Sequence, residues 1–129
     1  MPNLGRETVH HVHADDVAQA FELSVLRPAA AIGESFHVVS PAALTLWGFA
    51  AVAASWFGRD APVQFLPWGE WRHSVPEKDG QVTWGHIFRS PNCSIEKAKS
   101  RLGYQPRYRS AEAVREALFR LIEAGSLQV

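Results

Sequence analysis

The sequence predicts an α/β fold: a small, helix-rich lobe with a few short strands. Hydrophobic residues make up 47% and charged residues 20% of the 129 positions, which is typical of a globular protein. The length is that of one ordinary domain, so we expect residues 1–129 to form a single domain. Capped helical patterns alternate with short β-favouring runs, and helix dominates the second half.

The first predicted helix follows the extended, His-rich segment GRETVHHVHA. Asp15 or Asp16 is expected to cap this helix, because a carboxylate accepts the free amide protons of the first turn. Pro28 is expected to stop it. Its predicted apolar stripe consists of residues spaced by four and a small neighbour: Val17, Phe21 and Val25, with Ala20.

The run GESFHVVS predicts a strand over residues 34–40, buried on both faces because its apolar content is dense. Thr45 is expected to cap a helix over residues 46–57 that Gly58 ends. This helix is apolar nearly all round, so we expect it to be covered on most sides. Although residues 35–58 carry no charged side chain, Pro41 interrupts the run, and we expect no membrane span.

Residues 61–68 predict a short strand and residues 77–88 a short helix. Two better-defined helices follow, each with an expected serine cap and a glycine stop. The first has Ser94 as cap, an apolar side of Ile95, Ala98 and Leu102, and Gly103 as stop. The second has Ser110 as cap, an apolar stripe of Val114, Leu118, Leu121 and Ile122, and Gly125 as stop.

Charge and cysteine content exclude several classes of function. Thirteen basic side chains balance thirteen acidic ones, so we expect neither a nucleic-acid partner nor a membrane partner. The single Cys93 excludes an internal disulfide and a multi-cysteine zinc site. The start, MPNLGRETVHH, has no apolar core segment, so we expect no signal peptide and a cytoplasmic location.

Several local clusters allow both a functional and a structural interpretation. His11, His13 and Asp15 fit a metal site of a small metalloenzyme, or a locally bonded helix start. The tryptophans of PWGEW, Trp68 and Trp71, fit a ring-stacking substrate pocket or the cover of a small core. The densest basic cluster fits a phosphate-binding rim or a solvated helix face; it contains Lys97, Lys99, Arg101, Arg107 and Arg109.

Three segments in order, HHVHADDVAQAF, GESFHVVSPAALTL and SPNCSIEKAKSRLGYQPRY, resemble the C-terminal part of the extended short-chain dehydrogenase/reductases. This is the NAD-dependent epimerase/dehydratase family. The first is similar to its His-Val-Asp-Asp-Val-Ala segment and the second to its late strand-turn-helix. The third looks like its Ser-x-x-Lys-Ala…Leu-Gly-Tyr/Trp-x-Pro signature. The resemblance spans nearly the whole chain and implies the substrate lobe of such an enzyme.

The cofactor half of that family has no counterpart here. Its Rossmann domain carries a Gly-rich loop, and no neighbouring glycines in this chain have the G-x-x-G-x-x-G or G-x-G-x-x-G spacing. The family's catalytic Tyr-x-x-x-Lys pair is also absent: Tyr104 is followed four residues later by Tyr108, and Tyr108 by Glu112. We therefore expect no catalytic residue and no cofactor bound by this chain alone, with NAD or NADP implied for the full-length family.

The resemblance implies the substrate-binding portion of a sugar or nucleotide-sugar epimerase, dehydratase or reductase that is inactive alone. The Arg-x-Gly-Asp-type element that grips a diphosphate in related enzymes is represented only by Arg89 in GHIFRSPN. The candidate substrate-binding residues are Trp68, Trp71, Arg72, Arg89 and Arg107. The alternative is a stand-alone binding or dimerisation module derived from that family. We expect self-association through the edge of strand 34–40 or through helix 46–57.

Overall fold

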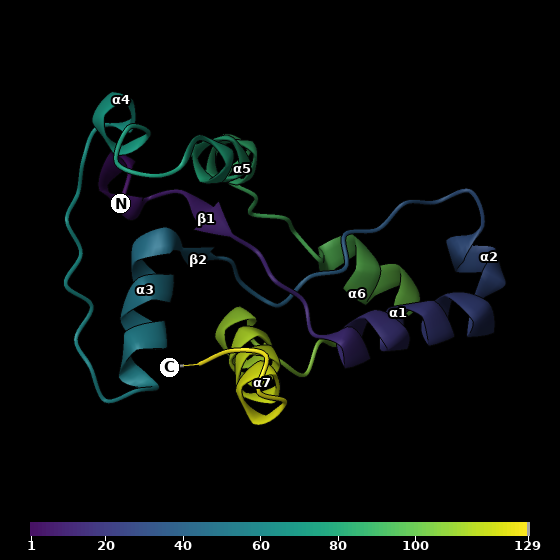
Figure 1. Ribbon diagram of the computed structural model, residues 1–129. Coiled ribbons are helices and arrows are strands. Elements are labelled where there is room, and N and C mark those ends of the chain that lie inside the picture. The colour runs from purple at the N-terminus through teal and green to yellow at the C-terminus, as the bar shows by residue number, and fades with distance from the viewer. Residues whose placement is uncertain (129) are drawn as a thin grey trace. The chain divides into compact units, whose positions relative to one another are not determined.

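The computed structural model describes residues 1–128, apart from the side chain of Ile87. The chain folds into two compact units, each assembled from two separate stretches of sequence. The first unit contains residues 1–9 and 44–92, and the second contains residues 10–43 and the chain from Cys93 onward. The described chain is rich in helix with one two-stranded sheet, as Figure 1 shows. The predicted helix-rich class with short strands is therefore confirmed at this level.

The first unit contains a small antiparallel sheet and three α-helices. Strand β1 (Thr8–Val9) pairs with β2 (Leu44–Thr45), so that Thr8 lies opposite Thr45. Its helices are the 3-10 helix η1 (Asn3–Gly5), α3 (Leu46–Ser55), α4 (Trp68–Trp71) and α5 (Glu77–Ile87). The Thr45 hydroxyl accepts the amide of Gly48 at 3.0 Å, which confirms the predicted cap of the apolar helix.

The second unit contains four helices around a small core. They are α1 (Ala14–Leu26), α2 (Pro28–Ala31), α6 (Glu96–Leu102) and α7 (Ser110–Glu123). Its buried cluster consists of Ala20, Ile95, Ala98 and Tyr104, against which Leu23, Phe36, Val38 and Val39 pack. Leu102 is also buried, so the predicted apolar side of α6 is confirmed. Gly103 ends α6 in the left-handed conformation, φ 74°, as its position predicts.

Neither longer predicted strand forms. In the described chain, residues 34–40 are irregular, and at their end the amide of Ser40 donates to the carbonyl of His11 at 3.1 Å. Residues 61–68 contain a single bridge, from Leu66 to Pro2. A strand requires a continuous hydrogen-bonding neighbour, and these β-favouring runs lack one. Instead, α4 begins at Trp68.

Two predicted caps are also wrong. The ring of His13, rather than Asp15 or Asp16, caps α1, because its Nδ1 accepts the amide of Asp15 at 3.1 Å. At α7, Ser110 is buried, and its hydroxyl lies 2.7 Å from that of Ser40. The carboxylate of Glu112 instead accepts the Arg109 amide at 2.7 Å. Asp16 and Ser110 are instead buried in contacts with distant segments, whereas Asp15 is exposed.

The apolar stripe of α1 faces a different way from the one predicted. Ala20 and Asp16 are buried, whereas Phe21 is 71% and Val25 78% exposed. The elements of the second unit pack on the side of α1 that carries Asp16, Ala20 and Leu23. As a result, the residues with the clearest four-residue period lie outside the core.

No described helix combines the length and the apolarity needed to cross a bilayer.

Candidate functional site

A pocket of about 730 Å³ lies in the first unit, between α4 and α5. This volume is within the range of small-molecule sites. Its lining combines two indole rings with polar and charged groups: Trp68, Arg72, His73, Val75, Glu77, Gly80, Gln81 and Trp84. The mixture of flat apolar surface and a few polar groups is the pattern that binds and orients a small ligand.

The two indole rings of this pocket belong to a row of four aromatic rings. The ring centroids of Trp71 and Trp68 are 5.3 Å apart, and those of Trp68 and Trp84 are 4.9 Å apart. Phe88 continues the row, 5.3 Å from Trp84. Phe88 is the C-cap residue of α5, four positions after Trp84, and its helical backbone conformation places it on the same face as Trp84. Trp84 is 44% exposed, so part of this residue remains accessible to a ligand.

Local sequence explains how the two helices of the pocket begin. Pro67 and Pro76 precede α4 and α5 in extended conformation, which suits proline. Glu77 and Asp79 lie in the first turn of α5, where negative charge interacts favourably with the helix dipole. Residues 72–76 connect the two helices, so side chains from α4, this connection and α5 line one pocket.

The polar groups of the pocket are partly held in place. His73 Nδ1 lies 2.6 Å from the carbonyl of Gly69, and since a carbonyl only accepts, this nitrogen carries a proton. In the neutral ring, Nε2 then offers a lone pair. Gln81 Nε2 donates to Glu77 Oε1 at 3.1 Å across one turn of α5. The pocket thus offers a guanidinium, an imidazole and a carboxamide beside its indole rings.

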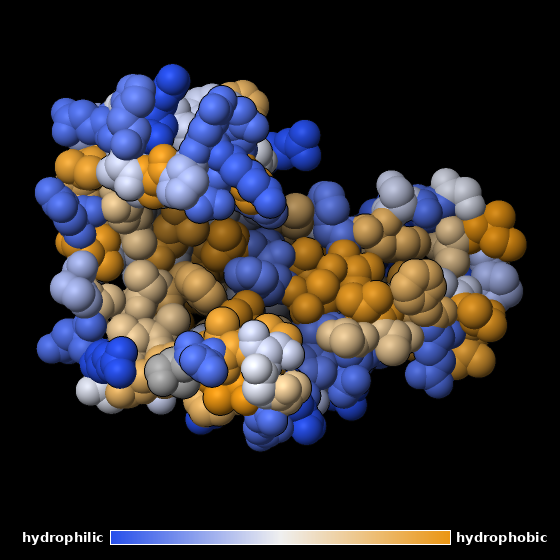
Figure 2. Space-filling view, in the orientation of Figure 1, coloured by the Kyte–Doolittle hydropathy of each residue, from blue (hydrophilic) through white to orange (hydrophobic). Residues whose placement is uncertain are grey.

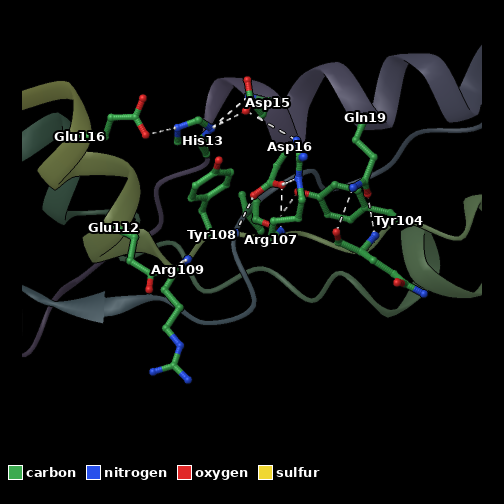
Figure 3. A network of polar contacts seen from close by, with 12 residues as sticks. His13, Asp15, Asp16, Gln19, Tyr104, Arg107, Tyr108, Arg109, Glu112 and Glu116 are labelled. Atoms are coloured by element: carbon green, nitrogen blue, oxygen red, sulfur yellow. Dashed lines mark hydrogen bonds and ion pairs between the residues drawn. The ribbon is translucent and has the colours of Figure 1, made fainter. Parts of the chain in front are cut away.

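A second polar network joins distant segments of the second unit (Figure 3). Asp16 is fully buried, and its carboxylate accepts the backbone amides of Arg107 at 2.9 Å and Tyr108 at 3.2 Å. The Arg107 side chain lies near the carboxylates of Asp15 and Asp16, at 3.6 and 3.8 Å. Gln19 adds a pair of bonds to the backbone of Gln105. The charge of Arg107 therefore serves a contact within the chain.

His13 belongs to the same network, and Figure 3 shows its ring over that of Tyr108. The two ring centroids are 3.8 Å apart with an angle of 19° between the planes. Because Nδ1 accepts the amide of Asp15, the geometry fits the tautomer in which Nε2 donates to Glu116 at 3.1 Å. These contacts hold the start of α1 and leave no ring nitrogen of His13 open for metal coordination.

Tyr104 has no environment for acid–base chemistry. The side chain is fully buried, and its hydroxyl donates to the carbonyl of Val39 at 3.1 Å. Burial, with a smaller contribution from the negative charge of Asp16, raises the pKa of Tyr104 to about 12. A phenol in this setting stays protonated at neutral pH, so it stabilises the fold rather than transferring protons.

The structure brings together three of the five candidate substrate-binding residues. Trp68 and Arg72 line the pocket, and the ring of Trp71 lies tilted against that of Trp68, with the centroids 5.3 Å apart. Arg89 is exposed in the turn after α5, and Arg107 belongs to the second unit. Trp84, His73 and Gln81, which also line the pocket, are not among the candidates from the sequence. Two features of the sequence could have indicated Trp84 and Gln81. Trp84 is four residues before Phe88, and Gln81 is three residues before Trp84, so all three lie on one side of the predicted helix.

The other clusters serve mainly internal contacts. Of the basic cluster, Lys97 and Arg101 both pair with Glu34, and Lys99 pairs with Glu96. Hydrogen bonds from Lys97 and then Arg101 hold the pKa of Glu34 below its usual value. Among residues 1–128, no three His, Cys, Asp or Glu side chains are grouped to hold a metal ion.

No known family model, curated protein or solved structure matches this chain.

Proposed function

We propose that this chain is the substrate-binding portion of an NAD(P)-dependent sugar epimerase, dehydratase or reductase, equivalent to the C-terminal part of an extended short-chain dehydrogenase/reductase. The proposal includes a cytoplasmic location and no enzymatic activity of this chain on its own. The observation that carries it is the contact between the segments that bear the resemblance. Asp16 of the first segment binds the backbone of Arg107 and Tyr108 in the third.

The second segment takes part in the same arrangement. Val39, in GESFHVVSPAALTL, accepts the hydroxyl of Tyr104, which belongs to the Leu-Gly-Tyr part of the third segment. Each of these residues lies within a short motif that is weak on its own. Their contacts give the motifs a shared structural purpose, because buried charge and buried hydroxyl groups need fixed partners. This supports a common origin with the family that the motifs resemble.

The pocket between α4 and α5 supports a sugar-type substrate. Indole faces such as those of Trp68 and Trp84 suit the apolar face of a sugar ring, and Arg72 suits a phosphate oxygen. Glu77 and Gln81 supply hydrogen-bonding groups for hydroxyls. In the proposed role, this chain binds and orients the substrate, while the hydride-transferring nicotinamide belongs to another part of the enzyme.

The residues of this chain do not fit a dinucleotide site. A pyrophosphate normally binds free amides at a helix N-terminus. The N-termini of α1, α3 and α7 are occupied by His13, Thr45 and Glu112. The first turn of α5 carries Glu77 and Asp79, whose charge offsets the positive end of the helix dipole. We therefore assign no reaction step to a cofactor on this chain.

The experiment is a titration of intrinsic tryptophan fluorescence with UDP-glucose, UDP and glucose 1-phosphate. The proposal predicts saturable quenching by at least one of these ligands. Substituting Trp84→Ala or Arg72→Gln is expected to weaken that binding by about tenfold or more, equivalent to about 1.4 kcal/mol. Trp47→Phe in α3 is the matched control and should leave the affinity unchanged. No quenching by any of the three ligands would count against a sugar-binding role.

The alternative is a stand-alone binding or dimerisation module of the same origin, without chemistry. The observation that favours it is the uncovered apolar face of α1, where Phe21 and Val25 are mostly exposed. A chain that only binds another protein needs no substrate pocket. Retained ligand binding in the fluorescence titration would therefore favour the substrate lobe over this alternative.

A further inference from the structure

The pocket between α4 and α5 carries two opposite charges that do not pair with each other. Arg72, at the end of α4, and Glu77, at the start of α5, both line it. Among residues 1–128, no carboxylate lies within ion-pair distance of Arg72, and no basic group lies within that distance of Glu77. Glu77 Oε1 accepts a bond from Gln81, which leaves the charge of the carboxylate in place. Both charges are therefore available to a ligand.

Two separate opposite charges in one pocket are matched by a ligand that carries both charges itself. A ligand with only an anionic group is attracted by Arg72 and repelled by Glu77. A cationic group on the same ligand turns the contact with Glu77 into an attraction. In Figure 2 the surface over α4 and α5 is mostly hydrophilic, which suits a polar ligand better than an apolar one.

The remaining lining groups suit an ammonium group near Glu77. The indole rings of Trp68 and Trp84, with centroids 4.9 Å apart, attract a cation that lies over their faces. The Nδ1 atom of His73 carries its proton toward the carbonyl of Gly69, so Nε2 of the neutral ring can accept a hydrogen bond from an ammonium. The anionic group of the ligand is left to Arg72, whose guanidinium can bind phosphate oxygens in pairs.

We propose that the ligand of this pocket is a phosphorylated amino sugar. Its phosphate binds Arg72, its ammonium group binds Glu77, and the apolar face of its ring lies against the indoles. This inference rests on the proposed sugar-binding function and narrows the class of sugar. Both charged residues are exposed, so each contact alone contributes little in water, and the ligand is selected by matching the two charges together.

The first test compares glucosamine 1-phosphate with glucose 1-phosphate, which lacks the amino group, by tryptophan fluorescence at neutral pH. Glucosamine 1-phosphate is expected to bind about fivefold more tightly. N-acetylglucosamine 1-phosphate, whose nitrogen is uncharged, should lose this advantage. Equal affinities of glucosamine 1-phosphate and glucose 1-phosphate would overturn this inference and leave the sugar-binding proposal standing. Failure of all the sugar phosphates and of UDP-glucose to bind would overturn both.

The second test assigns the preference to one carboxylate. Glu77→Gln should weaken glucosamine 1-phosphate by about fivefold and change the affinity for glucose 1-phosphate by less than about twofold. Retained binding of glucose 1-phosphate then shows that the pocket of this variant is intact. The matched control is Asp79→Asn, which removes an acidic charge from the same first turn but not from the pocket lining, and should keep the preference. Arg72→Gln should weaken both ligands equally, since both carry the phosphate. A preference that survives Glu77→Gln would overturn the inference.

Discussion

The carboxylate of Asp16 accepts the backbone amide of Tyr108 at 3.2 Å, although 92 positions separate the two residues in sequence. The same carboxylate accepts the amide of Arg107. Because Asp16 is fully buried, these bonds replace the water that its charge would otherwise need. This contact fixes the first turn of α1 to the segment that leads into α7, and it connects two of the motifs on which the proposed family origin depends.

We expect Asp16→Asn to destabilise the protein by about 2–3 kcal/mol, because an amide group cannot accept both bonds without turning a donor toward an amide proton. The measurement is urea unfolding followed by circular dichroism. The control, Asp15→Asn, removes an exposed carboxylate at the neighbouring position and should cost less than about 1 kcal/mol. Equal effects of the two substitutions would contradict the role assigned to Asp16.

The raised pKa of Tyr104 can be observed directly, since the chain has only two tyrosines. In a Tyr108→Phe variant, ultraviolet titration reports Tyr104 alone and is expected to give a pKa of about 12 rather than the ordinary value near 10. The folded pKa is the higher one, so this group's contribution to stability is full below pH 10 and is lost as the pH rises toward 12. Titration near 10 in the folded protein would contradict the burial of this phenol.

Gly103 lies in close contact with the side chain of Arg27 at the end of α6. It has φ 74°, and a Cβ there would lie 2.5 Å from Nη1 of Arg27, which also donates to the carbonyl of Leu102. We expect Gly103→Ala to cost more than Gly33→Ala, by about 1 kcal/mol. Gly33 has φ 76° but open space around its Cα. Gly33→Ala therefore measures the free-energy cost of placing a side chain at positive φ without any steric contact. Equal losses in thermal unfolding would show that the Arg27 contact contributes nothing.

The lowered pKa of Glu34 predicts a loss of stability in acid. Its bonds to Lys97 and Arg101 favour the charged form in the folded state, so the contribution is present above the unfolded pKa and is lost as the pH falls through the folded one. The stability difference between wild type and Glu34→Gln should therefore exist at neutral pH and disappear at pH values well below 4.5. Glu22→Gln, at an exposed site on α1, is the control and should show no such pH dependence.

Most helices of this fold follow from local signals in the sequence. Thr45 caps α3, and Gly103 and Gly125 end α6 and α7 with positive φ, because these signals act within one turn of the chain. The predicted short helix over residues 77–88 is confirmed by α5. Strands were predicted less well, because residues such as those of GESFHVVS favour a strand only where a neighbouring strand exists.

The buried side of α1 was not predictable from periodicity alone. Both the stripe with Phe21 and the side with Ala20 are compatible with a helix, and the choice depends on where residues 104–108 and α6 pack. The burial of Ser110 has the same cause: its partner Ser40 is 70 positions away. In the pocket, PWGEW indicated Trp68, but Trp84 joins it only because α4 and α5 fold back on each other.

The central claim is that this chain holds a substrate and no cofactor, and calorimetric titration with NAD and NADP tests it most directly. The account predicts no saturable heat with either dinucleotide, because side chains occupy the N-termini of α1, α3 and α7 and the first turn of α5 is acidic. A parallel titration of UDP-glucose into the same preparation shows whether the pocket between α4 and α5 can bind a sugar ligand. Saturable binding of NAD or NADP near micromolar concentration would mean that the chain builds a dinucleotide site of its own and would contradict the account.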